Sequence, residues 1–498
     1  SRGTTITKEK MSQQGEEGAA SSGSGLGSGE AKEKQRAHFV FIPLMAQGHV
    51  IPSLDTAFLL ATHGAVCSMV ATPSTAARIR PCIEQSGLEV RLLEFPLEYV
   101  ADGADNLDNI PRERLAGYFQ AVALLGEPVQ ECLVRQTPPV TCIVSDFSHP
   151  WTVPIAAALG VPRLGFFPMC AFCALCEHNA HKFNCLQDSS GEEPYDVVAV
   201  PFLDKTLELR REEAPRFLRH PAVGTLGEDI DRALAQGAGM ILNTFLELEP
   251  DHVRGLADAW GKTVWSVGPV SLHHPLAATT TCRGDAASMD CLQWLDGKEP
   301  ASVVYVSFGT LAHKTDPDML LKLALGLEAS GHPFVWVLGK ADQPFADSSQ
   351  PLQDLEARVG AADTGRIVRE WVPQLLVLSH AAVGCFLTHC GWNSVMETIV
   401  AAKPVVTWPR LVGTDHFVNE KLTVDVLGIG LSVRPKDAHL PVRREAIQAA
   451  LTAVLHGGEQ GEEMRTRVRA LSVKAKAAMQ PGGSSHTNLS DLVQRFTI

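Results

Sequence analysis

Short apolar runs that alternate with segments of helical periodicity are the feature that most constrains the fold of this chain. The run "HFVFIPL" (38–44) has the length of a buried strand, and "SLDTAFLLATHG" (53–64) has apolar residues at helical spacing and ends in a glycine. Further strand-like runs are "AVCSMVAT" (65–72), "VTCIVSD" (140–146) and "VPRLGFF" (161–167). Such alternation predicts an α/β fold in which helices cover parallel sheets.

The pattern occurs twice along the chain. The segment 271–290 contains few large apolar residues and many Thr, Ala and Gly residues, so we predict a linker there. After it, "SVVYVSFGT" (302–310) opens a second series of strands and helices. The simplest architecture is two doubly wound domains that face each other across a cleft, with ligands at the carboxyl ends of the strands.

Composition limits the classes of protein to which this chain can belong. Residues 1–36 lack aromatic side chains and are rich in Gly, Ser, Glu and Lys, so we predict a disordered tail rather than a signal peptide. The net charge of -13 argues against a nucleic-acid partner. No apolar run approaches the roughly 20 residues that span a bilayer. The twelve scattered cysteines suit reduced thiols, and we expect a cytoplasmic protein.

Three short patterns resemble metal sites. Cys170, Cys173 and Cys176 have iron–sulfur spacing but lack the fourth cysteine, so buried thiols in a helix are the favoured interpretation. The two D-x-D patterns, at 229–231 and 316–318, lie in predicted helices and are read as solvated or first-turn acids. No metal site is predicted from them.

The stretch "GCFLTHCGWNSVMET" (384–398) places polar residues where a strand turns into a helix. Such a helix N-terminus offers free N–H groups to phosphate, and His389 could add a donor. Ser394 and Glu397 also match a capping box, which is the second interpretation. Metal binding ranks third, because the spacing of the His and Cys residues is irregular.

The longer segment "WVPQLLVLSHAAVGCFLTHCGWNSVMETIVAAKPVVTWP" (371–409) closely resembles the C-terminal signature of plant UDP-dependent glycosyltransferases of small molecules. The rest of the folded chain is similar to the same family in order and spacing. The resemblance implies a GT-B fold, inversion at the anomeric carbon of a UDP-sugar, and no cofactor or metal. It implies an acceptor-binding domain over 37–270, a donor-binding domain over 291–480, and a C-terminal helix in 481–498 that returns to the first domain.

By the same resemblance, Trp371 would stack on uracil and Gln374 would lie near the base and ribose. Glu397 would bind the ribose hydroxyls, which is a second role beside capping. Trp392 would lie beside the sugar.

The diphosphate is expected to have two sets of contacts. His389, Asn393 and Ser394 resemble the family's main set. Ser307 and Thr310, in "SFGT" at the end of a strand, look like its second phosphate loop.

The catalytic base is expected in the first half of the chain. His49, in "AQGHVIP" just past the first strand, matches the family's catalytic His. A neutral imidazole can take a hydroxyl proton near physiological pH. Asp146, at the end of another strand, matches the Asp that orients this His; without the family it could be only a helix cap.

The donor sugar is expected from a departure from the family pattern. In "WPRLVGTDHFVNEKL" the segment is two residues longer than usual, and Asp415 and His416 match the family's pair of Asp or Glu followed by Gln, which binds sugar hydroxyls. In the family, His at this place is associated with galactose and arabinose. Pro168 has no side-chain donor for a 6-hydroxyl, which suits a pentose. We therefore expect UDP-arabinose as the donor, ahead of UDP-galactose, and UDP-glucose is kept as a further alternative.

The N-terminal half resembles the branch of the family that contains many triterpenoid, steroid and flavonoid transferases, which implies a lipophilic specialised metabolite as the acceptor, a triterpenoid rather than a flavonoid. The run "GFFPMCAFCALC" (165–176) would suit such an acceptor, although a core helix explains it equally. A nicotinamide dehydrogenase would need a G-x-G-x-x-G after the first strand, which is missing. A non-catalytic nucleotide-sugar or lipid-binding protein would have no need of His49 with Asp146.

Overall fold

The computed structural model describes residues 35–97, 104–186, 196–216, 223–273, 286–309, 315–437 and 439–498. The predicted tail lies outside these ranges except for residues 35 and 36. Thr310 and most of the predicted linker also lie outside them. Gln35 exchanges two backbone hydrogen bonds with Ile498, at 2.7 and 3.1 Å, so the last residues of the predicted tail are part of the fold.

The first series of strands forms a seven-stranded sheet in the order β3-β2-β1-β4-β5-β8-β9, with every pair parallel. Its strands are β1 (His38–Ile42), β2 (Val66–Ala71), β3 (Val90–Glu94), β4 (Cys142–Asp146), β5 (Arg163–Phe167), β8 (Gly239–Leu242) and β9 (Thr263–Ser266). An antiparallel hairpin, β6 (Val197–Phe202) and β7 (Lys205–Arg210), stands apart from the sheet.

The second series forms a six-stranded parallel sheet in the order β12-β11-β10-β13-β14-β15. Its strands are β10 (Val303–Ser307), β11 (Phe334–Val337), β12 (Gly365–Val368), β13 (Val383–Thr388), β14 (Val405–Thr407) and β15 (Gly430–Ser432). The central strands β10 and β13 are buried along their whole length because helices cover both faces. The prediction of two doubly wound parallel sheets is confirmed.

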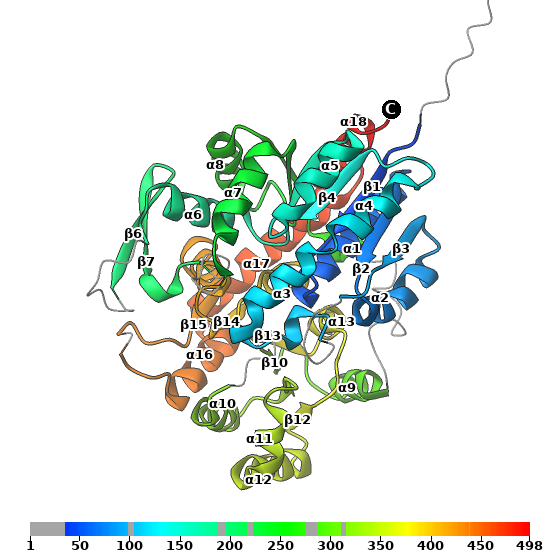
Figure 1. Cartoon of the computed structure of the whole chain (residues 1–498). Coiled ribbons are helices and arrows are strands. Elements are labelled where there is room, and N and C mark those ends of the chain that lie inside the picture. Colours follow the sequence, from blue (N-terminus) through cyan, green and yellow to red (C-terminus); the bar gives the residue numbers. More distant parts are fainter. Residues whose placement is uncertain are drawn as a thin grey trace, which may run out of the picture. The chain divides into compact units, whose positions relative to one another are not determined.

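Helices connect the strands in both halves (Figure 1). In the first half these are α1 (Gln47–Thr62), α2 (Pro73–Ser86), α3 (Leu115–Ala123), α4 (Gly126–Val134), α5 (Val153–Leu159), α6 (Ala171–Lys182), α7 (Leu226–Gln236) and α8 (Pro250–Trp260). In the second half they are α9 (Ala286–Asp296), α10 (Pro317–Ser330), α11 (Gln343–Ser348), α12 (Gln350–Ala361), α13 (Gln374–Ser379), α14 (Trp392–Val400), α15 (His416–Lys421) and α16 (Arg444–His456). None of the helices in the described ranges has both the length and the apolarity needed to cross a bilayer.

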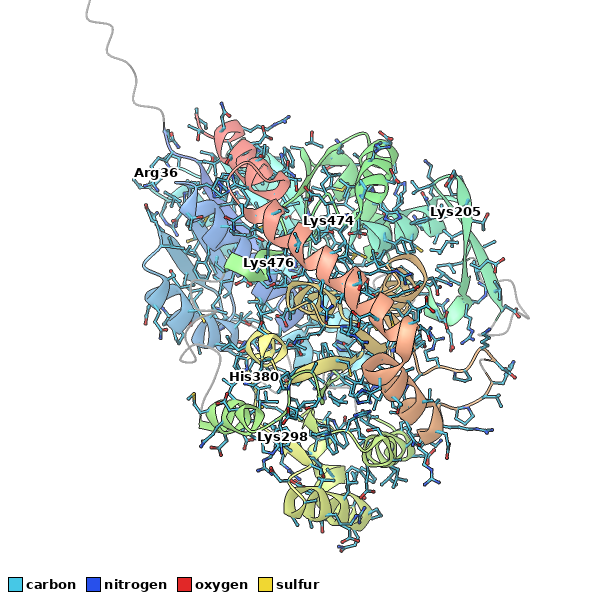
Figure 2. The ribbon with its side chains drawn as sticks, turned by 180° about the vertical axis from the view of Figure 1, so that it is seen from behind. Arg36, Lys205, Lys298, His380, Lys474 and Lys476 are labelled. Carbon is cyan, nitrogen blue, oxygen red and sulfur yellow. The ribbon has the colours of Figure 1, made fainter. Side chains whose placement is uncertain are left out.

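The last two helices connect the halves. The long helix α17 (Gly458–Met479) packs on α14 and α16, and Figure 2 shows it from behind, with Lys474 and Lys476 labelled along it. The following helix α18 (Ser484–Arg495) packs on β9 and α1 of the first half. There Trp265 donates a hydrogen bond to Asp491 at 2.8 Å, and the Ser485 hydroxyl donates to the Gly268 carbonyl at 2.6 Å.

The strand order reverses at one place in each sheet. In the first sheet the reversal lies between β1 and β4, and in the second between β10 and β13. Connections leave in opposite directions from such neighbouring strands, which opens a crevice at their carboxyl ends. His49 and Asp146 lie at the first crevice, and Ser307 and His389 lie at the second.

Helix α1 begins earlier than the sequence predicts. It starts at Gln47 rather than near Ser53, so His49 lies in its first helical turn and not on a loop. Pro52 lies inside the helix, in its second turn, and has no N–H to donate to the Gly48 carbonyl four residues earlier, which accepts a hydrogen bond from Asn393 instead. The Asp108 carboxylate accepts a hydrogen bond from the Gln47 N–H at 2.9 Å, which caps this turn.

Candidate active site

A cleft of about 390 Å³ is lined by residues from both halves of the fold. Its lining includes these residues predicted for the site from the sequence: His49, Pro168, Ser307, Trp371, Gln374, His389, Trp392, Asn393, Ser394, Glu397, Asp415 and His416. Asp146 lies behind His49 with 1% of its surface exposed. Thr310 is outside the described residues.

His49 and Asp146 form a direct pair. Nδ1 of His49 lies 2.7 Å from Oδ2 of Asp146, and the His49 side chain keeps 23% of its surface exposed. Because a carboxylate only accepts, Nδ1 carries the hydrogen and Nε2 is left as the basic nitrogen. The second oxygen of Asp146 accepts from the N–H and the hydroxyl of Ser148, at 3.0 and 2.7 Å, and Phe147 stacks beside the His49 ring.

Burial and charge act in opposite directions on this pair. Burial is the largest single influence on His49 and acts to lower its pKa, but the charge and hydrogen bond of Asp146, together with the charges of Asp415 and Asp108, outweigh it and leave the pKa raised. Burial likewise acts to raise the pKa of Asp146, but His49 and the Ser148 hydroxyl help lower it to about 2. Asp146 is therefore ionised at neutral pH and stabilises the protonated form of His49.

The end of the cleft near α13 and α14 is lined by Trp371 and by three residues that are hydrogen-bonded to one another: Gln374, Glu397 and Ser394. Nε2 of Gln374 donates to Oε2 of Glu397 at 2.8 Å and to Oγ of Ser394 at 3.1 Å. Trp371 lines the cleft and has 37% of its surface exposed.

The predicted capping box on α14 is wrong. The helix begins at Trp392, with Gly391 as its N-cap and no side-chain cap, so Ser394 lies inside the first turn. Its hydroxyl accepts the hydrogen bond from Gln374 instead. Glu397 is likewise bonded to Gln374 and is not the acid of a cap.

His389 lies in a narrow space next to the N-terminus of α14. A Cβ placed on Gly309 or Gly391 would approach its Nε2 to 2.7 or 2.5 Å, so only glycine leaves room for this ring. The His416 ring meets it edge to face, with the centroids 4.7 Å apart. Burial, together with His416 and Arg410, lowers the pKa of His389 well below its usual value, so the imidazole is neutral.

Asn243 is a cleft residue that the sequence reasoning missed. Its carbonyl accepts from the Trp392 indole at 2.6 Å, and its amide donates to Asn393 at 3.4 Å. Asn393 in turn donates to the Gly48 carbonyl at 2.9 Å. Asn243 follows the buried strand β8, so a polar residue at the end of a strand was the signal that could have found it.

Asp415 and His416 begin α15 on the second half of the fold. Asn419 donates to Asp415 at 2.6 Å and to the Cys390 carbonyl at 2.9 Å, which holds the carboxylate in place. The Cys170 thiol, at the N-cap of α6, reaches Asn419 from the first half at 3.2 Å.

The cysteine run belongs mainly to the core. Cys170, Cys173 and Cys176 are buried free thiols at the start of α6, as predicted. From this part of the chain, Pro168, Met169 and Cys173 reach the cleft lining. The D-x-D acids lie where predicted, in α7 and at the start of α10.

Comparisons with known proteins agree with this geometry. The family described as "UDP-glucoronosyl and UDP-glucosyl transferase" matches residues 267–456. UDP-glycosyltransferase 73C6 of Arabidopsis thaliana is 35% identical over 478 residues, which cover 92% of this chain and 96% of that protein.

Two solved structures share the whole fold. The Glycyrrhiza uralensis UGT73P12 structure, complexed with glycyrrhetinic acid 3-O-monoglucuronide, is 34% identical with a TM-score of 0.82, covering 93% of this chain and 96% of that one. Os79 from O. sativa, in complex with UDP, is 26% identical with a TM-score of 0.73, covering 92% and 100%. The chain is a UDP-glycosyltransferase with the GT-B fold and belongs to the plant family of these enzymes.

Proposed function

We propose that this enzyme transfers arabinose from UDP-arabinose to a hydroxyl group of a lipophilic plant metabolite, a triterpenoid in preference to a flavonoid. UDP-galactose and UDP-glucose are the alternative donors. The observation that carries transfer to a hydroxyl is the 2.7 Å contact between His49 and Asp146 in a cleft lined by both halves.

The reaction follows from the tautomer of His49. Nε2 takes the proton of the acceptor hydroxyl while the acceptor oxygen bonds to the anomeric carbon of the sugar. The bond between that carbon and the UDP oxygen breaks, UDP leaves, and the anomeric configuration inverts. Asp146 stabilises the imidazolium that forms, and the proton later passes to solvent.

We propose that Trp371, Gln374 and Glu397 hold the uridine. His389 and the N-terminus of α14, with Asn393 and Ser394, would hold the diphosphate. The support for this assignment is their common location at the carboxyl ends of β12 and β13 and the positive end of the α14 dipole. Ser307 faces the same cleft and Thr310 keeps its predicted role. We propose that no metal is needed, so activity should persist in EDTA.

The preference for a pentose rests on two residues of the cleft. His416 and Asp415 line it, and the His416 ring packs edge to face on His389. Galactose and arabinose share an axial 4-hydroxyl, and a neutral imidazole offers one donor nitrogen and one acceptor nitrogen to such a hydroxyl. Pro168 lines the cleft without a side-chain donor, which favours a sugar without a 6-hydroxyl.

The acceptor assignment rests on the first half of the cleft. Its lining is largely apolar: Leu44, Ile51, Leu107, Ile110, Leu115, Phe147 and Met169. Such a surface suits a bulky hydrophobic ring system with one reacting hydroxyl. The Glycyrrhiza relative complexed with a triterpenoid glucuronide supports the same class. The free cysteines support our proposal of a cytosolic location.

A competition assay tests the proposal. Purified protein is incubated with equimolar UDP-glucose, UDP-galactose and UDP-arabinose and with triterpenoid and flavonoid acceptors, and mass spectrometry reads the mass added to each product. A pentose on triterpenoids is expected, and a hexose would contradict the donor assignment. His416→Gln should shift the product ratio towards glucose, and an unchanged ratio would show that His416 does not select the sugar.

A further inference from the structure

The first half of the fold contacts the loop that precedes α15. We define the sugar loop as residues 411–416 and the clasp as residues 211–216, which follow the hairpin strand β7. Gly413 donates its N–H to the Glu212 carbonyl at 3.2 Å, and Arg216 donates its N–H to the Gly413 carbonyl at 2.9 Å. Gly413 has φ of +78°, a conformation that favours glycine. The backbone of the sugar loop is therefore held from the opposite half of the cleft.

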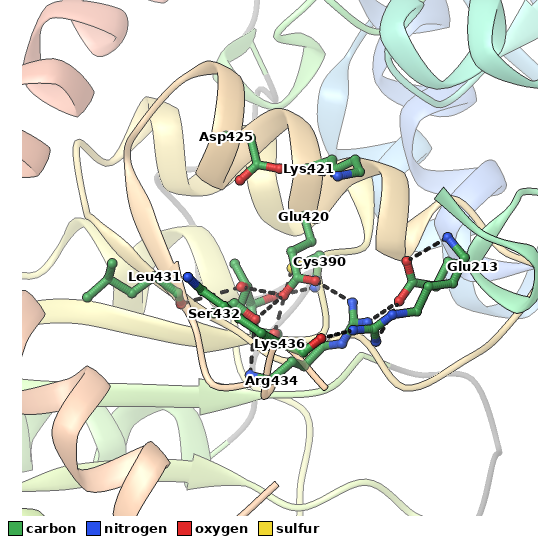
Figure 3. Close-up of polar contacts among 12 residues, drawn as sticks. Glu213, Cys390, Glu420, Lys421, Asp425, Leu431, Ser432, Arg434 and Lys436 are labelled. Atoms are coloured by element: carbon green, nitrogen blue, oxygen red, sulfur yellow. Dashed lines mark hydrogen bonds and ion pairs between the residues drawn. The ribbon is translucent and has the colours of Figure 1, made fainter. Parts of the chain in front are cut away.

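A buried ion network lies beside these backbone bonds (Figure 3). Arg434 is bonded to Glu213 of the clasp and, at 2.6 Å, to Glu420 on α15. The side chains of Arg434, Glu213 and Glu420 are only 16%, 9% and 10% exposed. Glu420 also accepts from the Thr407 and Ser432 hydroxyls at 2.7 and 2.8 Å, so it is anchored to the second sheet.

Two further contacts link this network to the sugar loop and strengthen the link between the halves. The Arg434 guanidinium lies 4.7 Å from the ring centroid of Phe417, the residue after His416. Arg210 donates to Glu213 at 3.2 Å and to the Lys436 carbonyl at 2.8 Å. Loss of the Glu213 charge would leave Arg434 with Glu420, which lies in the same half, so this network would no longer join the two halves through an ion pair.

The residues assigned to uridine have separate supports. Gln374 is held by Glu397, Ser394 and Tyr305, all in the second half. Loss of the clasp should therefore disturb the sugar end of the donor site more than the nucleotide end.

We propose that Glu213 is a positioning residue for the donor sugar, through which the first half of the fold sets the position of Asp415 and His416. The inference rests on the proposed function, in which these two residues bind the sugar. Pro215 of the clasp lines the same cleft as the sugar loop. The choice of donor sugar would therefore depend on residues of both halves of the fold.

The test compares the affinity for UDP with the affinity for UDP-arabinose and UDP-glucose, measured by calorimetry without acceptor. Glu213→Gln keeps the shape of the side chain and removes its charge. Glu208→Gln, on an exposed position of β7, is the matched control. We expect the Kd for the UDP-sugars to rise about tenfold in Glu213→Gln with the Kd for UDP within about twofold, and both to be unchanged in the control.

A second variant keeps the test decisive if Glu213→Gln folds poorly. Arg434→Lys keeps the positive charge but has no planar guanidinium with which to bridge two carboxylates. It should therefore also raise the Kd for the UDP-sugars more than the Kd for UDP, by a smaller factor than Glu213→Gln. Equal changes for UDP and UDP-sugars, or a lower melting temperature with no change in either Kd, would overturn the inference. Failure of the proposed function would give a different result, because the protein without any substitution would then bind UDP-sugars but transfer no sugar to an acceptor.

Discussion

Asn393 donates a hydrogen bond to the Gly48 carbonyl at 2.9 Å, which ties the second half of the fold to the residue before His49. The residue proposed to contact the diphosphate thus also helps fix the position of the proposed base. Transfer requires that the base and the leaving group are held in a defined arrangement around the anomeric carbon, and small displacements of either lower the rate.

Asn393→Ala should therefore lower kcat as well as donor affinity. We expect a fall in kcat of about tenfold or more, since the base and the donor lose a common anchor. Steady-state kinetics with saturating acceptor measures it, with the melting temperature as the control for folding. A rise in KM for the donor with normal kcat would mean that Asn393 only binds the donor.

His49→Ala should abolish transfer and leave the nucleotide site intact. We expect a loss in kcat of about 10²- to 10⁴-fold, because the acceptor hydroxyl loses its proposed base. Calorimetric titration with UDP should give a Kd within about twofold of that of the unchanged protein, because Trp371, Gln374 and Glu397 are untouched. Equal loss of both properties would make His49 a structural residue.

The pH dependence of kcat/KM should report the His49–Asp146 pair. The base acts in its neutral form, so the rate falls as pH decreases through the raised pKa of His49. Asp146→Asn removes the charge that raises this pKa, so burial should dominate and the acidic limb should move to lower pH, at a lower maximal rate. An acidic limb that stays in place would show that it belongs to another group.

Gly391→Ala should weaken donor binding through His389. A Cβ at this position would approach Nε2 of His389 to 2.5 Å, so the buried ring must move. We expect the Kd for UDP to rise about tenfold, equivalent to about 1.4 kcal/mol. Gly360→Ala on α12 is the matched control, since its Cβ would meet nothing within 4 Å. Unchanged UDP affinity in Gly391→Ala would show that His389 makes no important contact with the diphosphate.

Local patterns predicted the order of strands and helices because the central strands of both sheets are buried over their own length. Runs such as "HFVFI" and "GCFLT" gave β1 and β13, and the polar residues at strand ends gave Asp146 and His389. The start of α1 was missed because Pro52 and the Gln-Gly-His sequence are not typical of a helix interior. The Asp108 carboxylate, which caps the first turn, is far away in sequence.

Contacts between the halves could not be predicted in the same way. Asn243 and Trp392 are 149 residues apart, and Glu213 and Arg434 are 221 residues apart. Their pairing depends on how the two sheets pack, which no local periodicity records. Ser394 shows the same limit, because its sequence pattern indicated a cap while its observed partner, Gln374, lies on another helix.

The path of α17 and α18 has a mechanical consequence. The chain enters the second half after β9 and returns to the first half between these two helices, where α18 packs on α1 and β9. The end of the chain is therefore part of the first half although it follows the second half in sequence. Any separation of the two halves that admits a large acceptor must either leave α18 in place, so that the strain falls on its junction with α17, or break the contacts of α18 with α1 and β9.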